Sequence, residues 1–234
     1  MSNITQQLEN IHSRIVKACE KCNRDAGQVQ ILAVSKTFGV NAISEAADAG
    51  QFAFGENYVT ESVAKIQYFQ ASGKLLQWHM IGHIQSNKAK AVAQHFQWVH
   101  SVDRLKIAQK LSENRPDAMP ELQVCLEVNV SAQATKGGIR PEEVSTLAAQ
   151  LAVLPGLRLR GLMCIPEPAQ GLSRQRQPFA LLRSLLEDLQ QKGHEVDTLS
   201  MGMSDDMEAA IMEGATIVRV GRAIFGERAY PAAT

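Results

Sequence analysis

The sequence predicts a (β/α)8 barrel, and three observations support this prediction. Short runs of β-branched and apolar residues recur eight times along the 234 residues, and segments with helical spacing of apolar residues separate them. No change in composition and no low-complexity stretch divides the chain. Eight is the number of parallel strands that closes such a barrel. We therefore expect residues 1–234 to form one α/β barrel domain.

Each predicted strand is short and is followed by polar or glycine-containing residues. The strands are Ile31–Ser35, Phe52–Gly55, Gln77–Gly82, Trp98–Val102, Gln123–Asn129, Arg158–Cys164, Thr198–Met201 and Thr216–Val220. The amphipathic segments that predict helices are Val40–Ala49, Tyr58–Gln70, Ser86–His95, Arg104–Ser112, Pro141–Val153, Pro178–Gln191 and Met207–Glu213. A further helix over residues 2–24 precedes the first strand, and we expect it to pack outside the barrel or to cover its lower end.

A doubly wound open sheet is the alternative fold for this pattern. Such a sheet normally carries a GxGxxG turn after its first strand. In this chain Lys-Thr-Phe-Gly-Val, residues 36–40, follows the first strand instead. The barrel is therefore the favoured prediction.

Composition excludes several classes of partner. The chain has 24 Lys+Arg and 24 Asp+Glu, and its pI is about 7.0, so no excess of positive charge is present to bind nucleic acid or an anionic membrane. No apolar run approaches the roughly 20 residues of a membrane span, and the amino-terminal segment is charged and helix-like. We expect a cytoplasmic protein.

The four cysteines predict neither a disulfide framework nor a metal site. Cys125 and Cys164 lie in apolar strands, and Cys19 and Cys22 form a CxxC pair inside a predicted helix. No strand precedes that pair, and no second close pair completes a zinc site.

Lys36 is the first candidate functional residue, because reacting groups in these barrels lie at the carboxyl ends of the strands. It follows Ile31–Ser35 with no intervening turn residue. A lysine at a strand end is commonly solvated or ion-paired. A partly buried lysine near other cations instead loses its proton easily and attacks aldehydes to give a Schiff base.

The loops after the seventh and eighth strands predict a phosphate site, which barrels of this type commonly hold there. Ser204 precedes a helix and is a natural cap, so its hydroxyl and nearby backbone N–H groups are placed to bind an anion. In the next loop Gly221 permits close backbone approach, and Arg222 adds positive charge. Either loop alone is also explained by capping and turning of the chain.

An aldehyde-seeking lysine opposite a phosphate site points to pyridoxal 5′-phosphate (PLP), which carries both groups. Arg219 alternates with its neighbours on the eighth strand. It is placed either to meet the pyridine nitrogen of PLP or to form an ion pair at the end of the barrel.

Motifs along nearly the whole chain support this interpretation. They are Leu32-Ala-Val-Ser-Lys36-Thr, Phe54-Gly-Glu-Asn-Tyr58, Trp78-His-Met-Ile-Gly82 with Gln85-Ser-Asn-Lys88, Gly161-Leu-Met163, Ser200-Met-Gly-Met-Ser204 with Asp205-Asp-Met-Glu208, and Val218-Arg-Val-Gly221 with Ile224-Phe-Gly226. With these motifs the chain resembles the pyridoxal phosphate homeostasis proteins, relatives of the amino-terminal barrel domain of alanine racemase.

The resemblance assigns roles to nine residues. It implies a covalent aldimine between Lys36 and PLP, and an Arg219 that faces the ring nitrogen. It implies that Asn57 and His79 line the cofactor face. It also implies that the phosphate is surrounded by Ser200, Met203, Ser204, Gly221 and Arg222.

Two positions qualify these assignments. Many relatives have a second lysine where this chain has Phe38, which puts transfer of cofactor between two such amines in doubt. Lys136 matches a family lysine and is either a second acceptor of PLP or a loop lysine in solvent.

The resemblance favours a carrier over an enzyme. A racemase needs a second base, which alanine racemase takes from a separate β domain and the facing subunit, and this chain ends at Thr234, just after its eighth unit. An arginine at the ring nitrogen also weakens the ring as an electron sink. We expect a monomeric PLP-binding protein with little or no catalysis that maintains PLP homeostasis and passes PLP to apo-enzymes. The alternatives are a PLP-dependent amino-acid racemase and a phosphate-binding aldolase that uses Lys36.

Overall fold

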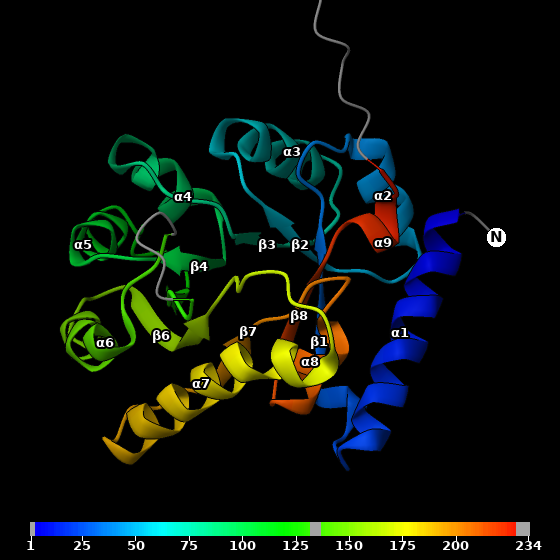
Figure 1. Ribbon diagram of the computed structural model, residues 1–234. Coiled ribbons are helices and arrows are strands. Elements are labelled where there is room, and N and C mark those ends of the chain that lie inside the picture. Colours follow the sequence, from blue (N-terminus) through cyan, green and yellow to red (C-terminus); the bar gives the residue numbers. More distant parts are fainter. Residues whose placement is uncertain (1–2, 132–136, 228–234) are drawn as a thin grey trace, which may run out of the picture.

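A computed structural model describes residues 3–131 and 137–227. Its eight parallel strands form a closed barrel in which each strand pairs with its neighbours in chain order, and β1 pairs with β8 (Figure 1). The strands are β1 (Gln30–Val34), β2 (Ala53–Glu56), β3 (Gln77–Met80), β4 (Trp98–Val102), β5 (Leu122–Glu127), β6 (Leu157–Met163), β7 (Thr198–Ser200) and β8 (Ile217–Val220). The predicted barrel is therefore confirmed.

Helices surround the barrel. The α-helices are α1 (Asn3–Lys21), α2 (Val40–Asp48), α3 (Val59–Ala71), α4 (Ala89–His95), α5 (Leu105–Glu113), α6 (Val144–Ala152), α7 (Leu172–Gln191), α8 (Met207–Met212) and α9 (Arg222–Phe225). Short 3-10 turns lie at η1 (Ala26–Gln28), η2 (Ser86–Lys88) and η3 (Pro141–Glu143). No described helix is both long and apolar enough to cross a bilayer.

The start of α7 corrects one predicted boundary. The sequence pattern placed the helix start at Pro178, whereas the helix begins at Leu172 after Gly171, whose φ is 85°. Pro178 lacks the N–H that would bond the Arg174 carbonyl. The helix tolerates this single lost bond in its second turn and continues to Gln191.

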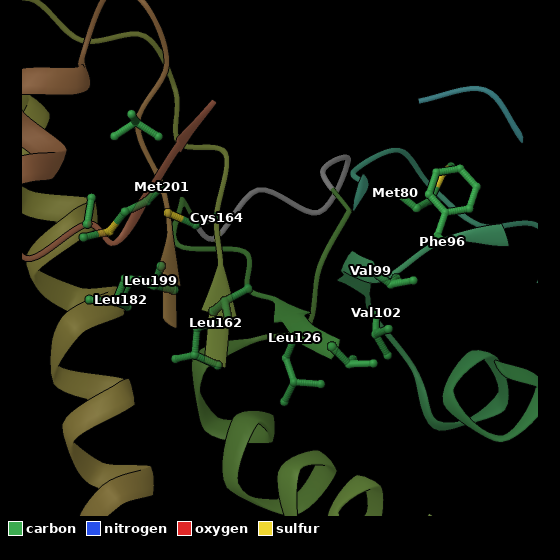
Figure 2. Close-up of a cluster of buried hydrophobic side chains, with 14 of the residues drawn as sticks. Met80, Phe96, Val99, Val102, Leu126, Leu162, Cys164, Leu182, Leu199 and Met201 are labelled. Atoms are coloured by element: carbon green, nitrogen blue, oxygen red, sulfur yellow. The ribbon is translucent and has the colours of Figure 1, made fainter. Parts of the chain in front are cut away.

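Two apolar layers hold the barrel together. Inside it, one buried cluster consists of Leu32, Ala53, Trp98, Cys125, Met163 and Ile217. A larger cluster fills the space between the strands and the helices. Figure 2 shows part of this outer layer, with Leu182 of α7, Leu199 and Met201 among its buried side chains. At about 25 cal/mol per Å² of apolar surface, these layers supply the main favourable term in folding.

The helix α1 packs against the outside of the barrel, beside α8 and α9 (Figure 1). Its buried face carries apolar residues at helical spacing, among them Leu8, Ile11 and Ile15. Arg24, three residues beyond the end of α1, donates to the carbonyls of Ile211 and Ala215, at 2.6 and 3.0 Å. Helix α1 is thereby tied to the segment that follows β7.

Candidate functional site

A pocket of about 230 Å³ opens at the carboxyl ends of the strands. Its walls come from the ends of β1, β2, β3 and β8, from the loops after β6, β7 and β8, and from the first turn of α7. The residues that line it are Val34, Lys36, Asn57, Ile81, Ile165, Pro166, Pro168, Ala169, Gln175, Met203, Ser204, Asp205, Asp206, Arg219, Gly221 and Arg222. Seven of the nine candidate residues are among them.

Lys36 lines this pocket together with Val34, the last residue of β1, and lies in the turn that follows the strand. Its side chain is half-buried. The next residue, Thr37, has a φ of 70°, which is unusual for a β-branched residue. The Thr37 N–H donates to the Glu61 carboxylate at 2.8 Å, so α3 holds the strained turn in place.

A buried ionic network lies behind that turn. Lys65 of α3 donates to Glu56 at 2.7 Å, to Glu61 at 2.6 Å and to the Ser35 carbonyl at 2.9 Å. The Ser35 hydroxyl donates to Glu56 at 2.6 Å. Burial raises the pKa of Glu56, whereas Lys65 lowers it. The network fixes the backbone on both sides of Lys36.

Arg219 is a buried cation on the pocket wall, with 4% of its surface exposed. It donates to the Ser200 carbonyl at 2.6 Å, to the Ser200 hydroxyl at 2.9 Å and to the Cys164 carbonyl at 2.8 Å. All three acceptors are neutral, and no carboxylate in the described part of the chain forms an ion pair with it. Burial lowers the pKa of this arginine, whereas the charges of Asp206 and Glu127 raise it. No carboxylate among the described residues is within ion-pair distance of the guanidinium, so a buried cation on the pocket wall favours an anionic or electron-rich ligand.

The loop after β7 differs from the prediction in its capping. Helix α8 begins at Met207 with Asp206 as its N-cap, so Ser204 does not cap the helix. The Asp206 carboxylate instead accepts the Met203 N–H at 2.6 Å. The Ser204 side chain lines the pocket, and its hydroxyl has no hydrogen-bond partner among the described residues.

The loop after β8 completes this wall. Gly221 lies against Val34, and a Cβ there would approach the Val34 carbonyl oxygen to 3.3 Å. Arg222 crosses to the neighbouring loop and donates to Asp205 at 3.0 Å. The two side chains are mostly exposed, so this pair can open toward an incoming anion at little cost.

Asn57 carries an unsatisfied polar atom. Its Oδ1 is buried and has no hydrogen-bond partner in the described structure. Buried polar atoms are normally hydrogen-bonded, and an unpartnered one on a pocket wall indicates a place for a ligand or water.

His79 and Ser200 do not line the pocket. Both are fully buried inside the barrel. His79 contacts Gln77 and His100, and Ser200 contacts His100 and Arg219. Ser200 therefore contacts Arg219 of the pocket wall without lining the cavity, and His79 is linked to Ser200 through His100.

Of the two positions that qualified the assignments, the structure describes Phe38 but not Lys136. The Phe38 ring stacks on Phe225 of α9, with 5.0 Å between ring centroids, and so joins the Lys36 turn to the loop after β8. Lys136 lies outside the described residues.

Sequence reasoning missed the loop after β6, which contributes Ile165, Pro166, Pro168 and Ala169 to the pocket, and Gln175 of α7. A usable signal was present, because these residues follow a predicted strand at its carboxyl end. Gln175 was not predicted because the predicted helix began at Pro178, whereas α7 begins at Leu172.

Comparisons with known proteins place this geometry in a family. Residues 7–229 match the family model for the alanine racemase N-terminal domain. The chain is 53% identical over 232 residues to the pyridoxal phosphate homeostasis protein of Vibrio cholerae, covering 98% of each chain. It is 48% identical over 231 residues to that of Escherichia coli, covering 98% of this chain and 99% of the relative. The chain belongs to the pyridoxal phosphate homeostasis protein family.

Solved structures agree with this membership. PipY from Synechococcus elongatus, with PLP bound, superposes with a TM-score of 0.83 at 34% identity, covering 95% of this chain and 100% of PipY. Alanine racemase from Corynebacterium glutamicum, at 15% identity, has a TM-score of 0.68 and covers 99% of this chain and 63% of the racemase. The latter likeness shows the fold alone. The pyridoxal phosphate homeostasis family thus shares its barrel with the racemase.

Proposed function

We propose that this protein binds PLP reversibly through Lys36 and maintains the PLP supply of the cell, with little or no catalysis of its own. The observation that carries the proposal is that Lys36, Arg219 and the loops after β7 and β8 line one pocket. PLP binding by PipY and the naming of the Vibrio cholerae relative support it.

The pocket residues match the chemical groups of PLP. The phosphate would be held by the hydroxyl of Ser204, the backbone N–H groups near Gly221 and the positive charge of Arg222, since each of these groups favours an anion. The unpartnered Oδ1 of Asn57 offers a buried acceptor. Lys36 binds the aldehyde carbon through Nζ as a Schiff base, with loss of one water, and a second amine reverses the step. In this arrangement Met203 packs beside the phosphate, whereas Ser200 and His79 act from inside the barrel.

Arg219 is the reason to propose a carrier rather than an enzyme. When bound, PLP supplies an electron sink whose strength depends on protonation of its ring nitrogen. A fixed cation beside that nitrogen disfavours the protonation. In the described part of the chain, the tyrosines are Tyr58 and Tyr68, which are 55% and 51% exposed and do not line the pocket, so neither is placed as a second base.

The proposal also covers the acceptors of PLP, the oligomeric state and the cellular compartment. We propose that the protein acts as a monomer in the cytoplasm and gives PLP to apo-enzymes by amine exchange. The exposed position of the Arg222–Asp205 pair is consistent with release through the loops after β7 and β8.

Lys36→Ala is expected to abolish covalent capture of PLP, because the variant lacks the only pocket-lining lysine of the described chain. The measurement is mass spectrometry of the protein after incubation with PLP and borohydride reduction. The control is Lys88→Ala, a half-buried lysine in a neighbouring cavity, which should keep the full adduct. An undiminished adduct in Lys36→Ala, for example on Lys136, would refute the assignment. Robust racemisation of common amino acids by wild type would refute the carrier role.

Arg14→Ala is expected to weaken PLP binding although Arg14 does not line the pocket. Arg14 of α1 donates to the Ser204 carbonyl at 2.8 Å and to both carboxylate oxygens of Glu208 at 2.8 and 2.9 Å. Its loss frees the Ser204 loop, and we expect the PLP dissociation constant to rise roughly three- to tenfold through lost preorganisation. The control is Arg140→Ala, an exposed arginine paired with Glu143. Equal affinities for the two variants would contradict the expectation.

A further inference from the structure

A continuous chain of hydrogen bonds leads from the pocket wall to the floor of the barrel. Arg219 donates to Ser200 Oγ at 2.9 Å, and Ser200 Oγ lies 2.7 Å from His100 Nδ1. His100 Nε2 lies 2.8 Å from His79 Nδ1, and His79 Nε2 lies 2.9 Å from Gln77 Oε1. The serine and both histidines are fully buried. Four strands, β8, β7, β4 and β3, contribute to the chain.

The acceptors fix the position of every proton in this chain. Gln77 Oε1 can only accept, so His79 carries its proton on Nε2. Burial lowers the pKa of His79 to about 3, so the ring is neutral and its Nδ1 is an acceptor. His100 must then donate from Nε2, because two ring nitrogens 2.8 Å apart need one proton between them.

The same reasoning settles the upper half of the chain. Burial also lowers the pKa of His100 well below its ordinary value, with His79 and Arg219 adding to the effect. Neutral His100 with its proton on Nε2 accepts at Nδ1, so the Ser200 hydroxyl donates to it. The oxygen of Ser200 is then oriented to accept from Arg219. All the donors point the same way, from Arg219 to Gln77, which strengthens each bond.

We propose that Ser200, His100 and His79 are positioning residues that hold the Arg219 guanidinium in the pocket wall and set its interaction with the ligand ring. This inference rests on the proposed function, because it treats Arg219 as the partner of the PLP ring. Three of the five guanidinium N–H groups are taken by Ser200 and Cys164, which leaves two donors. The ring of His79 stacks on Trp98 at an interplanar angle of 2°, with 5.4 Å between centroids, and anchors the lower end.

The proton positions in this series of hydrogen bonds can be tested before any PLP is added. In protein labelled with ¹⁵N at histidine, NMR should show His79 and His100 as neutral rings with the proton on Nε2 throughout pH 5–8. A proton on Nδ1 of either ring, or titration of either ring in this range, would overturn the inference whatever the protein binds.

Ser200→Ala tests the effect on the ligand. The variant keeps the Ser200 carbonyl as an acceptor but removes the hydroxyl that joins Arg219 to His100, and we expect the PLP dissociation constant to rise about tenfold. The absorbance band of bound PLP should also shift, and the His100 Nδ1 signal should move. The matched control is Ser101→Ala, since the Ser101 side chain is also buried and its hydroxyl donates to the Gly82 carbonyl at 2.6 Å. The control should lose similar stability without these changes.

The outcomes separate the two proposals. If wild type forms the Lys36 adduct and Ser200→Ala matches it in affinity and absorbance, the positioning role is wrong and the carrier proposal stands. If wild type captures no PLP, the carrier proposal fails, and the positioning role for the ligand ring fails with it, whereas the NMR result still reports on the buried chain.

Discussion

Lys65→Met is expected to lower the free energy of unfolding by about 3–5 kcal/mol at pH 7, because it leaves a buried carboxylate without its cation. The Lys65 and Glu56 side chains are 7% and 0% exposed. The remaining partners of Glu56 are the hydroxyls of Ser35 and Ser62, at 2.6 and 3.5 Å. Urea unfolding of wild type and variant measures the difference.

The loss of stability in Lys65→Met should depend on pH, because it depends on the ionisation of Glu56. Burial raises the pKa of Glu56 in the folded state, and loss of Lys65 raises it further. A carboxyl group with a raised folded pKa favours folding when it is protonated, and the advantage disappears as pH rises through the folded pKa. The deficit of Lys65→Met should therefore be largest at neutral pH and shrink as the pH is lowered.

Two controls isolate the buried network. Lys74→Met removes a surface lysine whose pair with Asp48 is 37% and 69% exposed, and it should cost less than about 1 kcal/mol. Adding Glu56→Gln to Lys65→Met should recover part of the loss, because the buried charge is then removed as well. Equal losses for Lys65→Met and Lys74→Met would show that the network contributes no more than a surface pair.

The strands were predictable because each is an apolar run with its own polar or glycine-containing end. Trp98–Val102 matches the observed β4 at both bounds, whereas the fifth strand ends at Glu127, two residues before the predicted Asn129. Strand ends depend on pairing with neighbours, which the local pattern does not encode. Pro178 misled for a related reason, since proline is common in the first turn of a helix but is also tolerated within it at the cost of one bond.

The sequence predicted the site residues at the strand ends, but not the arrangement of the buried residues on the strands. Lys36, Asn57 and Gly221 lie within two residues of strand ends, and the rule that functional residues lie at the carboxyl ends of the strands places them in the site. His79 and Ser200 lie on the strands themselves, and whether such side chains reach the cavity depends on their height in the barrel. The contact between His100 and Ser200 joins residues 100 positions apart, and only the sheet register brings them together.

Gly161→Ala is expected to cost more than about 4 kcal/mol, or to give no folded protein, because a side chain has no space at this position of β6. A Cβ on Gly161 would lie 1.9 Å from the Thr198 carbonyl oxygen and 2.8 Å from its carbon. These are backbone atoms of the paired strand β7, with Gly161 and Thr198 in direct register, so relief requires separation of β6 from β7. The matched control is Gly171→Ala, where φ is also positive, at 85°, and nothing lies within 4 Å of a Cβ. That change should cost only about 1 kcal/mol from backbone strain. Thermal and urea unfolding of both variants distinguishes steric overlap from backbone strain. Equal losses of unfolding free energy would mean that β7 moves away at Thr198, and that glycine is needed at position 161 only for its backbone angle.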